Sequence, residues 1–263
     1  MLIRNENKFI IVLSILVSFC NNIAKATDNY ITITLQAKGK VEFYIKGTGE
    51  VTIDWGDGNI QRSMISESSV SWKGLQKFTN EEPYERYRHR YRSKESQTTI
   101  TITGDDMVFF TCKSNNVTSL DISNNPKLRL LDVSNNLLNN LDVSKNVELF
   151  YLYCSGNQLT GLCLRDNMKI SCIDVSFNEF SAGALNAMYE TFREQPEWGS
   201  IWIGSNPGAQ FSDLCIAWKK GWIVCVHPSV RAICLNPNQG EEIDEYNAFL
   251  KTTNKKLSTS IIK

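Results

Sequence analysis

The second half of the chain repeats itself at a fixed interval. Leu-Asp-Ile-Ser at 120–123 returns as Leu-Asp-Val-Ser at 141–144, a shift of 21 residues, and a second series with the same interval is interleaved with it. The first apolar residues of that series are Phe110, Leu131, Leu152 and Ile173. A coil of about 20 residues cannot bury its own apolar edge and must stack on its neighbours. The repeat therefore predicts a solenoid of coils, each built from two nested half-units.

Asparagine stands at the sixth position of every half-unit and again after the next strand register at 201–203. These residues are Asn115, Asn125, Asn136, Asn146, Asn157, Asn167, Asn178 and Asn206. A side-chain amide both donates and accepts hydrogen bonds, so it can pair the backbone groups that a turn leaves open in its own coil and in the next. We interpret this column as a structural ladder without a catalytic role.

The third position of each half-unit is apolar and faces the core. Cys112 and Cys154 occupy it two coils apart, roughly 10 Å at about 4.8 Å per stacked strand, which is beyond disulfide reach. They are predicted to act as small core hydrophobes. Cys163 and Cys172 fall in outward columns and are candidate free thiols.

A 28-residue step between Ile173 and Ile201 predicts an inserted helix. Ser181 suits its N-cap, and a buried stripe at helical spacing follows: Leu185, Met188, Tyr189 and Phe192. A second helix at 212–220 and a strand at 222–226 are expected to form a C-terminal cap over 209–235, after a solenoid at 106–208. Cys215, Cys225 and Cys234 cluster in the cap, and the sequence leaves open whether two of them form a disulfide and which two. Residues 236–263 read as a polar tail.

Residues 28–105 alternate between apolar and polar with a period of two, which predicts a β-sandwich. The alternation is interrupted at 54–58 by Asp-Trp-Gly-Asp-Gly, where Asp54 and Asp57 are expected to brace a turn. A calcium corner is the weaker alternative for this pair, and an acid and base pair of glycosidase type the weakest. Arginines at 86, 88, 90 and 92 give one strand a basic face.

The N-terminus and the composition point to export. Residues 1–26 have a basic start, an apolar run and a small-x-small site ending at Ala26, the pattern of a signal peptide that would leave no transmembrane segment in the mature chain. Lipidation at Cys20 is an alternative that Phe19 disfavours. The 28 basic and 28 acidic residues balance, which argues against nucleic acid as a partner. Two histidines offer little for catalysis or metal binding, so no enzyme activity, cofactor or metal is expected.

Two stretches resemble a known architecture. The segments 51–58, 89–91 and 98–104 are similar to a PKD-like β-sandwich, and the Leu-Asp-Val-Ser-x-Asn units resemble the leucine-rich-repeat part of the same exported bacterial family. The resemblance covers roughly residues 30–227, and it implies a secreted or cell-surface protein that binds host or glycan partners. The chain departs from the family pattern at 61–85, which resembles an insertion, at 163–167 and in its tail.

Strand alternation also separates the two outward faces of the solenoid. The face of the 120, 141 and 162 series is largely polar. The other face carries the candidate binding residues Phe109, Arg129, Leu130, Asp132, Phe150, Tyr151, Tyr153, Asp174 and Trp202. Aromatic side chains interleaved with Asp and Arg are typical of interaction surfaces, so we expect this face to bind an extracellular protein or a glycan. The alternatives are that other parts of the chain cover it and that the protein is a passive spacer in a surface assembly.

Overall fold

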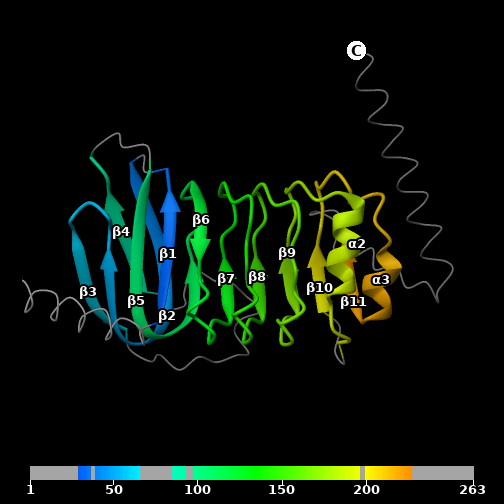
Figure 1. The fold of residues 1–263 in the computed structure, drawn as a ribbon, viewed down its shortest axis with the longest axis horizontal. Coiled ribbons are helices and arrows are strands. Elements are labelled where there is room, and N and C mark those ends of the chain that lie inside the picture. Colours follow the sequence, from blue (N-terminus) through cyan, green and yellow to red (C-terminus); the bar gives the residue numbers. More distant parts are fainter. Residues whose placement is uncertain (1–28, 37–38, 66–84, 93–96, 196–198, 227–263) are drawn as a thin grey trace, which may run out of the picture.

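The computed structural model describes residues 29–36, 39–65, 85–92, 97–195 and 199–226, and most of its elements are strands (Figure 1). The mainly β prediction is confirmed. The N-terminal half holds β1 (Tyr30–Leu35), β2 (Lys40–Asp54), β3 (Ile60–Ile65), β4 (Glu85–Arg90), β5 (Thr98–Thr111) and β6 (Val117–Asp121). The C-terminal half holds β7 (Leu130–Asp132), β8 (Tyr151–Tyr153), β9 (Cys172–Asp174), α2 (Ala182–Glu190), β10 (Gly199–Trp202), α3 (Leu214–Lys219) and β11 (Trp222–Cys225).

The eleven described strands belong to one hydrogen-bonded sheet. Strand β5, 14 residues long, is its centre, because β1 pairs antiparallel with its first half and β7 pairs parallel with its second half. Strand β2 runs along the other side of β5 and also pairs with β3 and β4. The boundary expected at residues 105 and 106 thus falls inside strand β5. Strand β2 pairs with β5 on both sides of that boundary, with a shift of register between Thr48 and Val51. The division into two domains and the sandwich architecture stay predictions.

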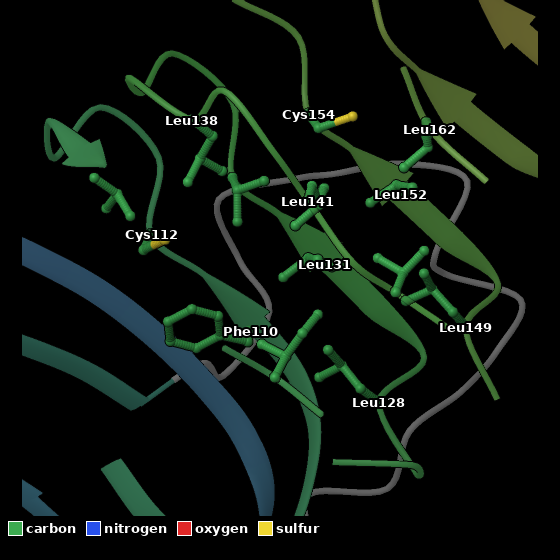
Figure 2. Close-up of a cluster of buried hydrophobic side chains, with 14 of the residues drawn as sticks. Phe110, Cys112, Leu128, Leu131, Leu138, Leu141, Leu149, Leu152, Cys154 and Leu162 are labelled. Atoms are coloured by element: carbon green, nitrogen blue, oxygen red, sulfur yellow. The ribbon is translucent and has the colours of Figure 1, made fainter. Parts of the chain in front are cut away.

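Strands β7 to β11 follow one another in parallel, side by side along the long axis of the molecule (Figure 1). Each carries a fully or nearly fully buried apolar residue at its centre: Leu131, Leu152, Ile173, Ile201 and Val224. Figure 2 shows how Leu131 and Leu152 gather with Leu128, Leu138, Leu149 and Cys154. Ile173, Ile201 and Val224 belong to the same core. Each fully buried aliphatic side chain contributes about 1.5–3 kcal/mol relative to an exposed one, so the stacked coils hold each other together.

The inserted helix α2 forms where the sequence predicts it. The Ser181 side chain accepts a hydrogen bond from the backbone N–H of Ala184 at 3.2 Å, which caps the first turn. Leu185, Met188 and Tyr189 are buried. Phe192 lies beyond the end of the helix, yet its buried ring packs 4.4 Å from that of Trp222 in β11. The helix therefore fastens the last coil to the cap.

Helix α3 and strand β11 lie in the segment expected to form the C-terminal cap, and the cap at 209–235 stays a prediction. Helix α3 starts later than expected, because Asp213 caps it through a hydrogen bond from Cys215 N at 3.0 Å. Gly221 ends it with φ of +78°, a left-handed conformation in which glycine carries no steric penalty. The predicted signal peptide at 1–26 with Cys20, the residue Cys234 and the predicted polar tail at 236–263 lie outside the described residues. The pairing within the cysteine group of the cap stays a prediction.

Candidate recognition surface

One set of asparagines links consecutive coils in both directions. The Asn136 amide donates to Val133 O of its own coil at 2.9 Å and to Cys112 O of the preceding coil at 3.1 Å. Its Oδ1 accepts from Asn115 N and Val117 N, both at 3.0 Å. Related bonds to the preceding coil recur at Asn157, Asn178 and Asn206. The first rung, Asn115, instead bonds both the N–H and the C=O of Glu42 in β2.

The interleaved asparagines act as donors only. The Asn146 amide donates to Ile122 O and Asn125 O, both at 2.9 Å, and Asn167 repeats the pattern one coil later. Their Oδ1 atoms, and that of Asn125, are buried without a partner. The asparagine amides of the two half-units therefore make different sets of hydrogen bonds.

Aspartates at the ends of β7 and β9 brace the turns that follow. Asp132 Oδ1 accepts from Ser134 N at 3.0 Å and Asp174 Oδ1 from Ser176 N at 2.9 Å. Asp121 and Asp142 do the same on the opposite face, and the bond from Ser144 N lowers the pKa of Asp142. The sequence predicted Asp132 and Asp174 as binding residues and did not reveal this local role, although Asp followed two residues later by Ser is an Asx-turn pattern.

Strand register places the outward side chains in two rows, because directly paired residues face the same side of a sheet. The first row is Lys46, Phe109, Leu130, Tyr151, Cys172, Ser200 and Ile223. The second is Arg86, Tyr44, Thr111, Asp132, Tyr153, Asp174, Trp202 and Cys225. Seven of the nine predicted binding residues thus lie in two adjacent rows on strands β7 to β10 and the end of β5.

Two of those seven, Phe109 and Leu130, are buried at 3% and 2% exposure, so they are not part of an accessible surface. This corrects the expectation that they are exposed. One physical reason is the register with β2, which places the Lys46 ammonium 5.7 Å from the centre of the Phe109 ring. Lys46 itself is 4% exposed. The accessible part of the face therefore lies over β8, β9 and β10.

Aromatic side chains dominate that accessible part. Tyr151 and Tyr153 both lie on β8, and their rings are nearly parallel. The ring centroids are 6.4 Å apart, and the angle between the ring planes is 8°. Phe150, 37% exposed, meets Tyr151 edge to face at 4.8 Å. Partial burial raises the pKa of both tyrosines, so their phenols stay neutral near pH 7. Trp202 is half-buried in β10, and Arg129 is half-buried in the segment before β7.

Phe177 is a further exposed aromatic residue, three positions after Asp174 at the end of β9, and the sequence reasoning missed it. Its side chain is 53% exposed, and its backbone has φ of +54° directly after the turn that Asp174 braces. The equivalent residues in other coils share the left-handed conformation: Ser114, Asn135, Gly156 and Ser205. This conformation costs a bulky residue roughly 1–2 kcal/mol. The sequence signal that could have identified Phe177 is a phenylalanine at a position where the other coils have small or polar residues.

The turn at 54–58 is held by its own polar groups. Asp54 Oδ1 accepts from Gly56 N at 2.9 Å, and Asp57 Oδ2 lies 2.7 Å from Nε2 of His89. Burial acts to raise the pKa of Asp57, but bonds from Asn59 and His89 lower it overall. Among the described residues, no group of three or more His, Cys, Asp or Glu side chains is placed to hold a metal ion.

The basic strand β4 is partly neutralised by one carboxylate. Glu42 on β2 forms ion pairs with Lys40 and with Arg88, whose Nε lies 3.0 Å from Oε2. The hydrogen bond from Lys40, followed by those from Tyr44 and Arg88, lowers the pKa of Glu42 to about 2. Since Arg86 pairs with Tyr44 in the second outward row, the basic strand and the Asp and aromatic rows share one face of the sheet.

No family model matches the chain, and no curated protein matches it. Among solved structures, the functional domain of InlJ from Listeria monocytogenes, which includes a cysteine ladder, is similar with 26% sequence identity and a TM-score of 0.35. That match covers 43% of this chain and 23% of the other. An internalin, InlF, from the same species matches with 14% identity and a TM-score of 0.31, over 38% of this chain and 36% of the other. Both likenesses thus span less than half of each chain.

Within the described ranges, the helices are too short and too polar to cross a membrane. Cys112 and Cys154 are buried at 1% and 0% exposure, and burial raises the pKa of both thiols, which keeps them protonated and unreactive. Cys163 is exposed and Cys172 is half-buried, with the Tyr153 hydroxyl 3.5 Å from the Cys172 sulfur.

Proposed function

We propose that the protein is an exported, non-enzymatic binding protein that captures a protein or glycan on the outward face of strands β8 to β10. The observation that carries the proposal is the contact of Phe150, Tyr151 and Tyr153 at β8, with Trp202 in the same outward row of the parallel sheet. Phe177 adds an exposed ring just after β9. Aromatic side chains of this kind supply large contact areas at low entropic cost, and they dominate the energetics of interfaces.

The leucine-rich-repeat solenoid and the PKD-like sandwich belong to this proposal as its scaffold. The coils are joined by the asparagine ladder, and its first rung on Glu42 ties them to β2. A continuous sheet would hold the N-terminal strands and the recognition surface at a fixed distance. The export signal at 1–26 and a location in the medium or at the cell surface complete the proposal.

The test is a screen of the purified protein on arrays of extracellular proteins and glycans. The triple variant Tyr151→Ser, Tyr153→Ser, Trp202→Ser is screened beside a matched control, Ser119→Ala, Asn140→Ala, Cys163→Ser, on the opposite face. Circular dichroism verifies that both variants keep the fold. We expect a partner that the control retains and the triple variant loses. Retention by the triple variant would move the function to the basic strand β4, and absence of any partner would favour a passive spacer.

A further inference from the structure

Asp174 on the recognition surface and Asp132 beside it on β7 have no ion-pair partner among the described residues. Asp132 and Asp174 are half-buried, and each uses Oδ1 to accept a turn N–H. Their Oδ2 atoms make no hydrogen bond, and neither side chain forms an ion pair with a cation in the described part of the chain. Glu42, Asp57, Asp106, Glu148 and Glu190 each pair with a basic side chain.

Aromatic rings flank these carboxylates. In the second outward row Tyr153 stands between Asp132 and Asp174, and Asp174 stands between Tyr153 and Trp202. Neighbouring strands lie about 4.8 Å apart, so a cation held over Asp174 comes within the roughly 6 Å at which both flanking rings attract it. The same face already shows this contact, since the Lys46 ammonium lies over the Phe109 ring.

We propose that this surface recognises a basic polypeptide segment, whose Arg or Lys side chains bind at Asp174 between Tyr153 and Trp202 and at Asp132 beside Tyr153. The proposal rests on the proposed function and names its ligand class. A neutral glycan would leave two half-buried charges uncompensated, whereas a cation offsets both the charge and the cost of its desolvation. The arginines of β4 on the same face repel such a segment and direct it toward β7 to β10.

The test uses tetra-arginine as the probe and tetra-citrulline as its neutral, nearly isosteric counterpart, with affinity measured by calorimetry. Asp174→Asn keeps an oxygen for Ser176 N, so the turn survives while the charge is removed. Asp142→Asn is the matched control, because Asp142 accepts from Ser144 N in the same way on the opposite face. We expect the Kd for tetra-arginine to rise about fivefold or more in Asp174→Asn, and further in the double variant with Asp132→Asn. Asp142→Asn changes it less than twofold.

The inference is overturned if tetra-citrulline binds as well as tetra-arginine, if the wild-type protein does not bind tetra-arginine, or if Asp142→Asn weakens binding as much as Asp174→Asn. Its failure is separable from failure of the proposed function. A partner lost by the aromatic triple variant but bound normally by Asp174→Asn would leave the recognition surface in place and reject only its preference for cations.

Discussion

Replacing Asn136 with alanine tests the ladder that fixes the recognition surface. The change leaves Asn115 N and Val117 N without their acceptor, and both groups belong to buried residues. An unpaired buried N–H costs about 1–3 kcal/mol, so the two together lower the free energy of unfolding by about 4 kcal/mol. That is a large share of the roughly 5–15 kcal/mol that a folded protein has.

Asn146→Ala provides the comparison within the same protein. It removes bonds to Ile122 O and Asn125 O, but these carbonyls still accept from Asn125 N at 3.0 Å and Leu128 N at 3.1 Å. Only the net value of two hydrogen bonds is lost, about 2 kcal/mol in total. Both variants remove the same side-chain atoms from sites that are less than 7% exposed. The free energy lost through poorer packing is therefore similar in the two variants.

The assay is urea unfolding followed by far-ultraviolet circular dichroism, with midpoints compared at a common slope. Asn140→Ala serves as the exposed control and should change stability by no more than about 0.5 kcal/mol. We expect the loss in free energy of unfolding to be largest for Asn136→Ala, smaller for Asn146→Ala and smallest for Asn140→Ala. If Asn136→Ala alone fails to fold, that result also agrees with this order. Equal losses at Asn136 and Asn146, or a larger loss at Asn146, would refute the reasoning.

Three further predictions concern other parts of the fold. The folded protein holds the pKa of Glu42 below its ordinary value of 4.5, so the ionised carboxylate stabilises the fold above that pH. This contribution is lost as the pH falls from about 4.5 through about 2. In acid titrations, the Glu42→Gln variant should therefore lose less stability over this pH window than the wild type. Gly56→Ala should lower Tm, with a loss of more than about 1 kcal/mol, because φ is +75° and the new Cβ would lie 2.2 Å from Thr99 O. Phe177→Asn should raise the free energy of unfolding by up to about 1 kcal/mol and weaken capture of a partner found on the arrays.

The sequence predicted the features that depend on the repeat. The asparagine column and the buried third position recur in every coil, so each coil confirms the reading of the others. The Ser181 cap and the stripe at Leu185 and Met188 were also readable, since both are local. A sequence period reports which side a residue faces, and this sufficed for the fold of the coils and for the choice of the candidate face.

The sequence period could not predict which distant strands pair with each other or which outward side chains are buried. The second half of β5 pairs with β7 on one side and β2 on the other, and no local pattern at residue 105 reveals it. The burial of Phe109 depends in part on Lys46, which comes from a strand far earlier in the chain. Phe177 was missed because its exposure follows from a backbone conformation and not from an apolar period.

The central claim is that the accessible outward face of β8 to β10 captures the partner. Hydroxyl-radical footprinting with mass spectrometry tests it most directly, because it reports side-chain accessibility residue by residue with the partner from the array screen bound. We predict that oxidation of Tyr151, Trp202 and Phe177 falls on binding, while oxidation of Phe211, which is 78% exposed near α3, stays unchanged. Unchanged oxidation of the three aromatic residues, with protection appearing on β3 or β4 instead, would contradict the account.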